Sequence, residues 1–107
     1  MQWADRIGRR LKPRDLHVFL AVAEQGNMAK AAERLAISRP VVSKTIAELE
    51  HTLGVRLLDR TSQGVEPTLY GRALRKRCLA VFDELKQSVK EIEFLADPRA
   101  GELRIGV

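Results

Sequence analysis

Two residues that favour helix starts, Asn27 and Ser38, lie close together in the chain and constrain its fold more than any other feature. Their side-chain oxygens can accept hydrogen bonds from unpaired backbone N–H groups of a first helical turn. The small residues at 31–32 let two helices approach closely. We therefore predict a short helix, a tight turn and a longer helix over about residues 39–53. In a helix-turn-helix of this kind, here at about residues 28–47, the second helix enters the DNA major groove.

The second helix of this motif has one apolar and one polar side. At about 100° per residue, its apolar residues from Val42 to Leu53 form one narrow stripe. The opposite side is polar, basic and low in bulk, which suits a surface that reads base edges. The alternative is an ordinary solvent-exposed face of an amphipathic helix. The residues expected at the major groove are Ser38, Arg39, Pro40, Ser43 and Lys44.

An amphipathic helix is expected before this motif. Pro13 suits a first helical turn because its missing N–H costs nothing there, and Asp15 suits the positive end of the helix dipole. Apolar residues within 16–23 then recur at helical spacing. We predict a helix over about residues 14–25, which joins the helix-turn-helix in one domain over residues 13–67.

A small hairpin, or wing, is expected after Gly54. Residues 55–60 have the apolar content of a strand, residues 61–64 form a turn, and residues 65–66 return before Pro67. A wing beside a helix-turn-helix contacts the DNA backbone or the minor groove, where a narrow groove attracts arginine. The residues expected to make this contact are Arg60, Ser62 and Gln63.

A long amphipathic helix is predicted from the cap at Thr68 to about residue 96. It measures about 42 Å at 1.5 Å per residue, which exceeds the size of the small domain. Its apolar residues alternate at spacings of four and three, as in a coiled-coil seam. We predict a linker helix that pairs with the same helix of a second copy, although the first two turns could instead fold back on their own domain. The predicted dimer interface is Leu74, Cys78, Val81, Phe82, Leu85, Val89, Ile92 and Leu95.

The net charge of +5 is concentrated in two places. Residues 1–12 form a basic N-terminal tail, for which a solvated segment is the favoured interpretation. A second cluster begins at Arg72, where positive charge in the first turns of a helix opposes the helix dipole. We expect an anionic partner there, either DNA phosphates or acidic side chains of a partner domain. The residues expected at the DNA backbone are Asn27, Lys30, Thr45, Arg72, Arg75 and Lys76.

Length and composition argue against several other classes of protein. At 107 residues the chain is about one domain long, and its longest apolar run, 18–23, is too short to span a membrane. No secretory signal is recognised, so a cytoplasmic location is expected. One cysteine and two separated histidines predict neither a disulfide nor a metal site. A carboxylate pair, a nucleophile beside a base and a phosphate-binding glycine loop are all missing, so no enzyme is expected.

Several blocks of this sequence resemble the N-terminal region of LysR-type bacterial transcriptional regulators. The resemblance covers about residues 11–107, and its blocks follow one another in the order of that family. Such agreement is more specific than any single motif. The blocks are residues 19–27, 31–35, 37–46, 49–50, 53–61 and 101–106.

The resemblance implies a mostly α-helical fold, in which a winged helix-turn-helix is followed by a long dimerisation helix over residues 68–96. Residues 97–107 are then the hinge and first strand of an effector-binding domain that the sequence lacks. It also implies double-stranded promoter DNA as a partner, a homodimer, a tetramer of the full-length protein and RNA polymerase as a further candidate partner. A small-molecule effector is expected to bind the missing C-terminal domain, and no cofactor is expected in this fragment.

Two departures from the family pattern bear on the site. Many members have glutamine where this chain has Arg39; arginine prefers the guanine O6/N7 edge and glutamine prefers adenine, so the base preference is open. The linker helix starts with Thr68 and Leu69 rather than the usual threonine and glutamate. Two other functions are also open: a protein-interaction module on a winged-helix scaffold, and a regulator of another winged-helix family, such as the MarR-like proteins.

Overall fold

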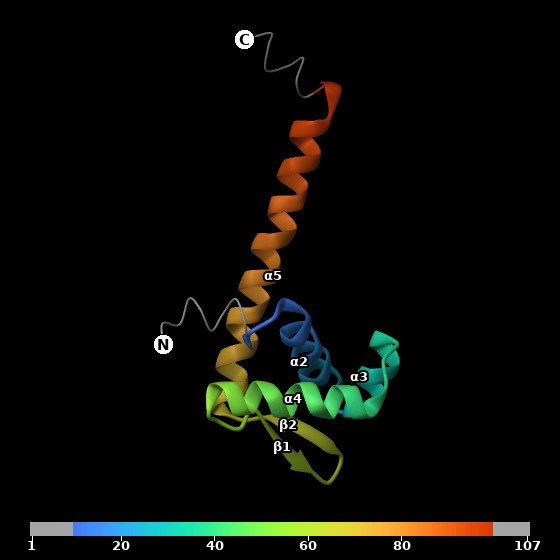
Figure 1. Cartoon of the computed structure of the whole chain (residues 1–107), viewed down its shortest axis with the longest axis vertical. Coiled ribbons are helices and arrows are strands. Elements are labelled where there is room, and N and C mark those ends of the chain that lie inside the picture. Colours follow the sequence, from blue (N-terminus) through green and yellow to red (C-terminus); the bar gives the residue numbers. More distant parts are fainter. Residues whose placement is uncertain (1–9, 100–107) are drawn as a thin grey trace.

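The computed structural model describes residues 10–99 and has the predicted winged helix-turn-helix with a long C-terminal helix (Figure 1). The expected strand after residue 101 and most of the N-terminal tail lie outside the described residues. The helices are α2 (Pro13–Gln25), α3 (Met28–Leu35), α4 (Arg39–Leu53) and α5 (Leu69–Ala96), and the strands are β1 (Leu58–Thr61) and β2 (Gly64–Pro67).

Local capping sets the bounds of the helix-turn-helix, as predicted. The Lys30 backbone N–H donates to Asn27 Oδ1 at 3.0 Å, and the Val41 N–H donates to Ser38 Oγ at 3.3 Å. The turn between α3 and α4 passes through Ala36, whose φ of 57° lies in the left-handed region. This conformation is unfavourable for a residue with a Cβ atom, so the turn is formed at a small energetic cost.

The core lies where α2, α3 and α4 meet, with α2 packed against both other helices. Ala31 and Ala32 are buried between α3 and its neighbours, as their small size predicted. The helix-turn-helix therefore rests on a packed apolar base that fixes how α4 is presented. The largest fully buried side chains are Phe19, Val22, Val42, Leu49 and Leu57.

The wing is an antiparallel hairpin whose first strand starts later than predicted. Its register places Leu58 opposite Pro67, and β1 begins at Leu58 rather than at residue 55. The prediction was wrong because Glu50 binds the chain just before the strand: its Oε2 accepts hydrogen bonds from the Leu57 and Leu58 N–H groups at 2.7 and 3.3 Å. A side chain of α4 thus takes the place of a strand partner.

Helix α5 consists of a packed half and a projecting half (Figure 1). In the packed half, Leu74 lies against the core, Cys78 is only 2% exposed, and the Phe82 ring makes an edge-to-face contact with His17 of α2 at 5.9 Å. Of the residues predicted for the dimer seam, Cys78 is thus buried by its own domain and Leu74 is partly buried by it. The alternative in which the first turns fold back is the one observed.

The projecting half of α5 extends away from the other elements with its apolar side uncovered (Figure 1). Along it, the predicted seam residues remain exposed by 46–64%. Within residues 10–99, no helix is long and apolar enough to cross a membrane. The exposed seam residues are Val81, Leu85, Val89, Ile92 and Leu95.

Candidate nucleic-acid interface

The outward side of α4 forms a polar crest, defined here as Arg39, Pro40, Ser43, Lys44 and Ala47, and all five residues are exposed. Helical geometry places this crest opposite the buried stripe of the same helix. Arg39 makes no ion pair and no side-chain hydrogen bond within residues 10–99. Its guanidinium is therefore available to a partner outside the described chain.

Two polar side chains of the crest, unlike Arg39, contact other residues of the chain. The Ser43 hydroxyl donates to the sulfur of Met28 at 3.4 Å, and Lys44 Nζ lies 4.0 Å from a carboxylate oxygen of Glu48. Both members of that ion pair are more than half exposed, so the attraction is weak and does not prevent Lys44 from binding another anion. Ser38 holds the first turn of α4 through its cap.

A hollow of about 200 Å³ separates the crest from the wing. Ser43 and Ala47 line it from α4, and Arg60 lines it from β1. Arg60 of the wing and the outward side of α4 thus border the same hollow. Arg56 lines the same hollow and sits 3.6 Å from the Asp59 carboxylate. The sequence analysis placed Arg56 in the expected first strand but did not name it as a site residue.

The wing tip carries the other two predicted wing residues. Ser62 and Gln63 form the turn between the strands, and both are exposed. The Gln63 N–H donates to the Thr61 hydroxyl at 3.2 Å, which shapes the turn and leaves the Gln63 side chain free of that bond. The N–H of Val65 donates to the Gly26 carbonyl at 3.0 Å, which ties the second strand to the turn between α2 and α3.

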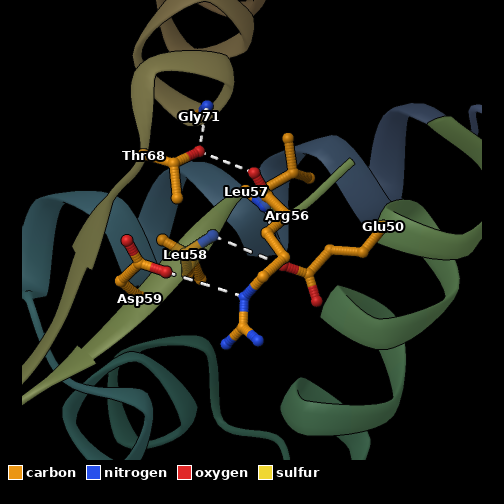
Figure 2. A network of polar contacts seen from close by, with 7 residues as sticks. All are labelled: Glu50, Arg56, Leu57, Leu58, Asp59, Thr68 and Gly71. Atoms are coloured by element: carbon orange, nitrogen blue, oxygen red, sulfur yellow. Dashed lines mark hydrogen bonds and ion pairs between the residues drawn. The ribbon is translucent and has the colours of Figure 1, made fainter. Parts of the chain in front are cut away.

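The base of the wing is held between α4 and α5 (Figure 2). On one side, Glu50 of α4 accepts the two N–H groups that precede and begin β1. On the other side, the Thr68 hydroxyl donates to the Arg56 carbonyl at 2.6 Å and caps α5 by accepting from the Gly71 N–H at 3.1 Å. The recognition helix, the wing and the long helix are therefore fixed to one another by a few polar contacts.

Gly71 is required at the start of α5 because a Cβ atom there would overlap the backbone carbonyl of Leu57. This glycine lets the long helix approach the strand base closely enough for the Thr68 bonds in Figure 2 to form. The sequence alone gave no sign of this close approach. Glu50 and Gly71 are thus positioning residues that sequence reasoning missed.

The residues predicted at the DNA backbone fall into three groups. Thr45 is only 9% exposed, at the edge of the buried side of α4, so little of its side chain is available for the predicted contact with the DNA backbone. The Asn27 oxygen is used in its cap, whereas its amide N–H groups and the exposed Lys30 can still donate. The exposed cations on α5 are the third group.

Arg72, Arg75 and Lys76 are exposed on the first turns of α5. A guanidinium N–H of Arg72 donates to the Pro67 carbonyl at 3.3 Å, so this side chain helps to hold the wing base. None of the three forms an ion pair within the described residues. No carboxylate within residues 10–99 therefore pairs with these three cations. Both predicted partners, DNA phosphates and acidic side chains of a partner domain, remain predictions.

Cys78 is not a reactive group in this fold. It is a free, buried cysteine, and burial raises the pKa of its thiol to about 11. The thiolate is the reactive form, so the side chain is unreactive near neutral pH. No group of three or more histidine, cysteine or acidic side chains within residues 10–99 could hold a metal ion.

The fold and the exposed basic crest define a winged helix-turn-helix regulator, and comparison with known proteins identifies its family. Residues 13–72 match the model of the bacterial regulatory helix-turn-helix proteins of the lysR family. The chain therefore belongs to the LysR family, as its sequence blocks indicated. Membership of this family rules out the MarR-like alternative.

Curated relatives show the same family. The chain is 37% identical over 100 residues to the HTH-type transcriptional regulator PcaQ of Agrobacterium fabrum, an alignment that covers 94% of this chain and 32% of that protein. It is 36% identical over 97 residues to the regulator GbpR of Azospirillum brasilense, covering 91% and 28% of the two chains. The chain thus spans about a third of the length of these relatives.

Solved structures of two DNA-binding domains have the same fold, and both contain DNA. The CbnR domain in its DNA complex superposes with a TM-score of 0.74 at 37% identity, covering 80% of this chain and 99% of that one. The BenM domain bound to a catB site superposes with a TM-score of 0.76 at 32% identity, covering 80% and 96%. These similarities confirm the winged helix fold.

Proposed function

We propose that this chain is the sequence-specific, dimeric DNA-binding module of a LysR-type transcriptional regulator. The observation that carries the proposal is the crest of α4: an exposed polar surface with an unpartnered arginine, rigidly mounted and flanked by the arginines of a wing. A protein-interaction module would not need cations on both elements. The DNA complexes of the structural relatives support the same partner for this chain.

In this proposal, the crest reads bases and the wing contacts the backbone. Arg39, at the first turn of α4, donates two hydrogen bonds to guanine O6 and N7, the bidentate contact that arginine makes in the major groove. Ser43 and Lys44 lie one turn further along the same side and add contacts to base edges or nearby phosphates. The wing binds the DNA backbone or the minor groove next to α4, through Arg60, Ser62 and Gln63.

Backbone contacts hold the helix in register. Asn27 and Lys30 are placed at the start of α3, where exposed donors can reach a phosphate. The cations at the start of α5 add affinity without base choice if they reach the DNA. Thr45 has no part in this proposal because it is buried.

The proposal includes a homodimer through the projecting half of α5. Residues such as Leu85 and Ile92 are about half exposed on one side of this helix, and an apolar stripe of this length is covered by a partner in water. The start of α5 is basic, whereas residues 91–97 carry three acids and no base. An antiparallel second copy brings these opposite charges together, so α5 itself supplies the acidic partner that its basic start requires.

The proposal extends to the full-length protein, of which this chain corresponds to about a third by the length of its relatives. A C-terminal domain binds the small-molecule effector, and subunits assemble into tetramers that act on promoter DNA in the cytoplasm. RNA polymerase is the candidate partner through which bound protein changes transcription. Catalysis is not part of this proposal.

The function is tested by measuring the affinity of the chain for two labelled duplexes, one recovered by selection and one scrambled, across a series of salt concentrations. We expect affinity to fall steeply with salt on both duplexes and to be higher on the selected one at every salt concentration. Equal affinity for both sequences would leave only non-specific binding. Absence of salt-dependent binding would contradict the function altogether and favour the protein-interaction module.

A further inference from the structure

We propose that Arg10 and Lys12 bind DNA phosphates on the side of α4 opposite the wing. Together with the wing, they place cations on both sides of the crest. The inference rests on the proposed DNA-binding function and goes beyond it, because the sequence favours a solvated tail for the N-terminal basic residues. It assigns a role to the two described cations at the start of the chain.

The geometry comes from two hollows that border the crest. One, already described, lies between α4 and the wing and is lined by Arg56 and Arg60. The other, of about 420 Å³, lies between α4 and the segment that leads into α2, and is lined by Arg10 and Lys12. Ala47 lines both hollows, which shows that the crest of α4 stands between them.

Lys44 lies at the boundary between this second hollow and the crest of α4. It belongs to the crest, and it lines both the hollow beside Arg10 and a smaller neighbouring one that Arg14 lines. A chain of cations therefore runs from the crest to the N-terminal segment. A ligand that touches Lys44 from that side also meets Lys12 and its neighbours.

Two carboxylates lie in the same hollow, and neither neutralises these cations. Glu48 is the ion-pair partner of Lys44 at 4.0 Å. Asp15 lies in the first turn of α2, where a negative charge complements the helix dipole. Neither Arg10 nor Lys12 forms an ion pair within residues 10–99, so both remain available to an external anion.

Helix stability does not explain the cation at Lys12. This residue is the N-cap of α2, yet its side chain makes no capping bond; its carbonyl accepts the Asp15 and Leu16 N–H groups instead. A positive charge at a helix start opposes the helix dipole. Any uncharged residue could supply the same carbonyl, so a partner outside the chain accounts for the lysine better than folding does.

The shape of DNA explains why cations are needed on two sides. A helix in the major groove, which is about 12 Å wide, lies between the two phosphate backbones that border the groove. Contacts on only one side leave the other backbone free of neutralising charge. With the wing on one backbone and Arg10 and Lys12 on the other, the helix is held in register from both sides.

The test compares Arg10→Ala/Lys12→Ala with the unchanged chain in salt titrations on the selected and the scrambled duplex. Each lost phosphate contact lowers the slope of log affinity against log salt by about 0.9, so we expect the slope to fall by about 1.8 for each bound subunit, and by about 3.6 when a dimer is bound, on both duplexes. Discrimination between the duplexes is expected to stay unchanged, since phosphates carry no sequence. In an ethylation-interference experiment, binding of the double variant should no longer be sensitive to ethylation of the phosphates on the side of the groove opposite the wing.

The matched control is Lys86→Ala/Lys90→Ala, which removes the same charge from exposed positions on the projecting half of α5. We expect it to retain the slope of the unchanged chain. An unchanged slope for Arg10→Ala/Lys12→Ala, or an equal fall in the control, would overturn the inference while salt-dependent binding by the unchanged chain still upheld the proposed function. If the unchanged chain itself fails to bind, the proposed function fails first.

Discussion

The two halves of α5 carry the same apolar stripe, but only one half is covered by its own chain. Cys78, in the packed half, is 2% exposed, whereas Leu85, two turns further along the stripe, is 48% exposed. The spacing of apolar residues in the sequence is the same in both halves. It therefore predicts an apolar surface that needs a partner, but it does not predict which partner covers that surface. The difference separates the part of the stripe that stabilises one subunit from the part that we propose joins two.

A second difference separates the projecting stripe from the crest of α4. Both surfaces are exposed within residues 10–99, but the first is apolar and the second is polar and basic. An apolar stripe is stabilised when another apolar surface removes it from water, whereas exposed cations are stabilised by hydrogen bonds to an anion. In the proposed function, one chain thus carries a surface for its own copy and a separate surface for nucleic acid.

The largest expected effect follows from a charge in the packed half. Cys78→Asp places a carboxylate where the side chain is only 2% exposed, so we expect a loss of about 3 kcal/mol or more in the free energy of unfolding. Urea unfolding followed by circular dichroism measures it. A loss below about 1 kcal/mol would mean that this part of the stripe is not a core position.

The same substitution in the projecting half should act differently. Leu85→Asp puts a charge in the proposed seam, so we expect sedimentation to show monomers while the winged helix domain keeps its circular dichroism. Affinity for a two-half-site duplex should fall because two subunits no longer bind as one unit. A sedimentation profile that Leu85→Asp leaves unchanged would refute the α5 interface.

A substitution on the crest should change base recognition without changing dimerisation. Arg39→Ala is expected to reduce discrimination at one base pair by about 1–3 kcal/mol and to leave the dimer intact. Binding to a panel of single-base variants measures it. The matched change Arg60→Ala should weaken binding to all of them alike, and equal losses on selected and scrambled DNA for Arg39→Ala would remove its base-reading role.

The smallest effect concerns the turn of the helix-turn-helix. Ala36 has a φ of 57°, which glycine adopts without the Cβ penalty, so Ala36→Gly should raise the stability of the domain by up to about 1 kcal/mol. The dimer dissociation constant should not change, because the turn is far from the projecting half of α5. A lower unfolding midpoint in urea would contradict the strain assigned to this turn.

The features that sequence predicted are those set by local interactions. Asn27, Ser38 and Thr68 cap helices through bonds to residues three positions on, so the helix bounds could be predicted closely. The exposed side of α4 followed from the helical period. The first strand could not be placed in this way, because its start depends on Glu50 reaching the Leu57 N–H from another element.

Two positions of the site were not predicted. Thr45 was assigned to the DNA backbone from its polarity, although its place three residues after Val42 and four before Leu49 puts it at the edge of the buried side of α4. The close approach of Gly71 to the Leu57 carbonyl joins segments on either side of the wing, and no local pattern encodes it. The exposed residues, by contrast, needed only the helical period and their chemistry.

Selection of bound sequences from a random duplex pool tests the central claim most directly, because it examines base reading and pairing of subunits together. The two surfaces of this chain predict enrichment of an inverted repeat, with one half-site read by the crest of each subunit at a fixed spacing. Enrichment of single half-sites without a repeat would contradict the dimer. A pool that remains random after selection would contradict sequence-specific recognition itself.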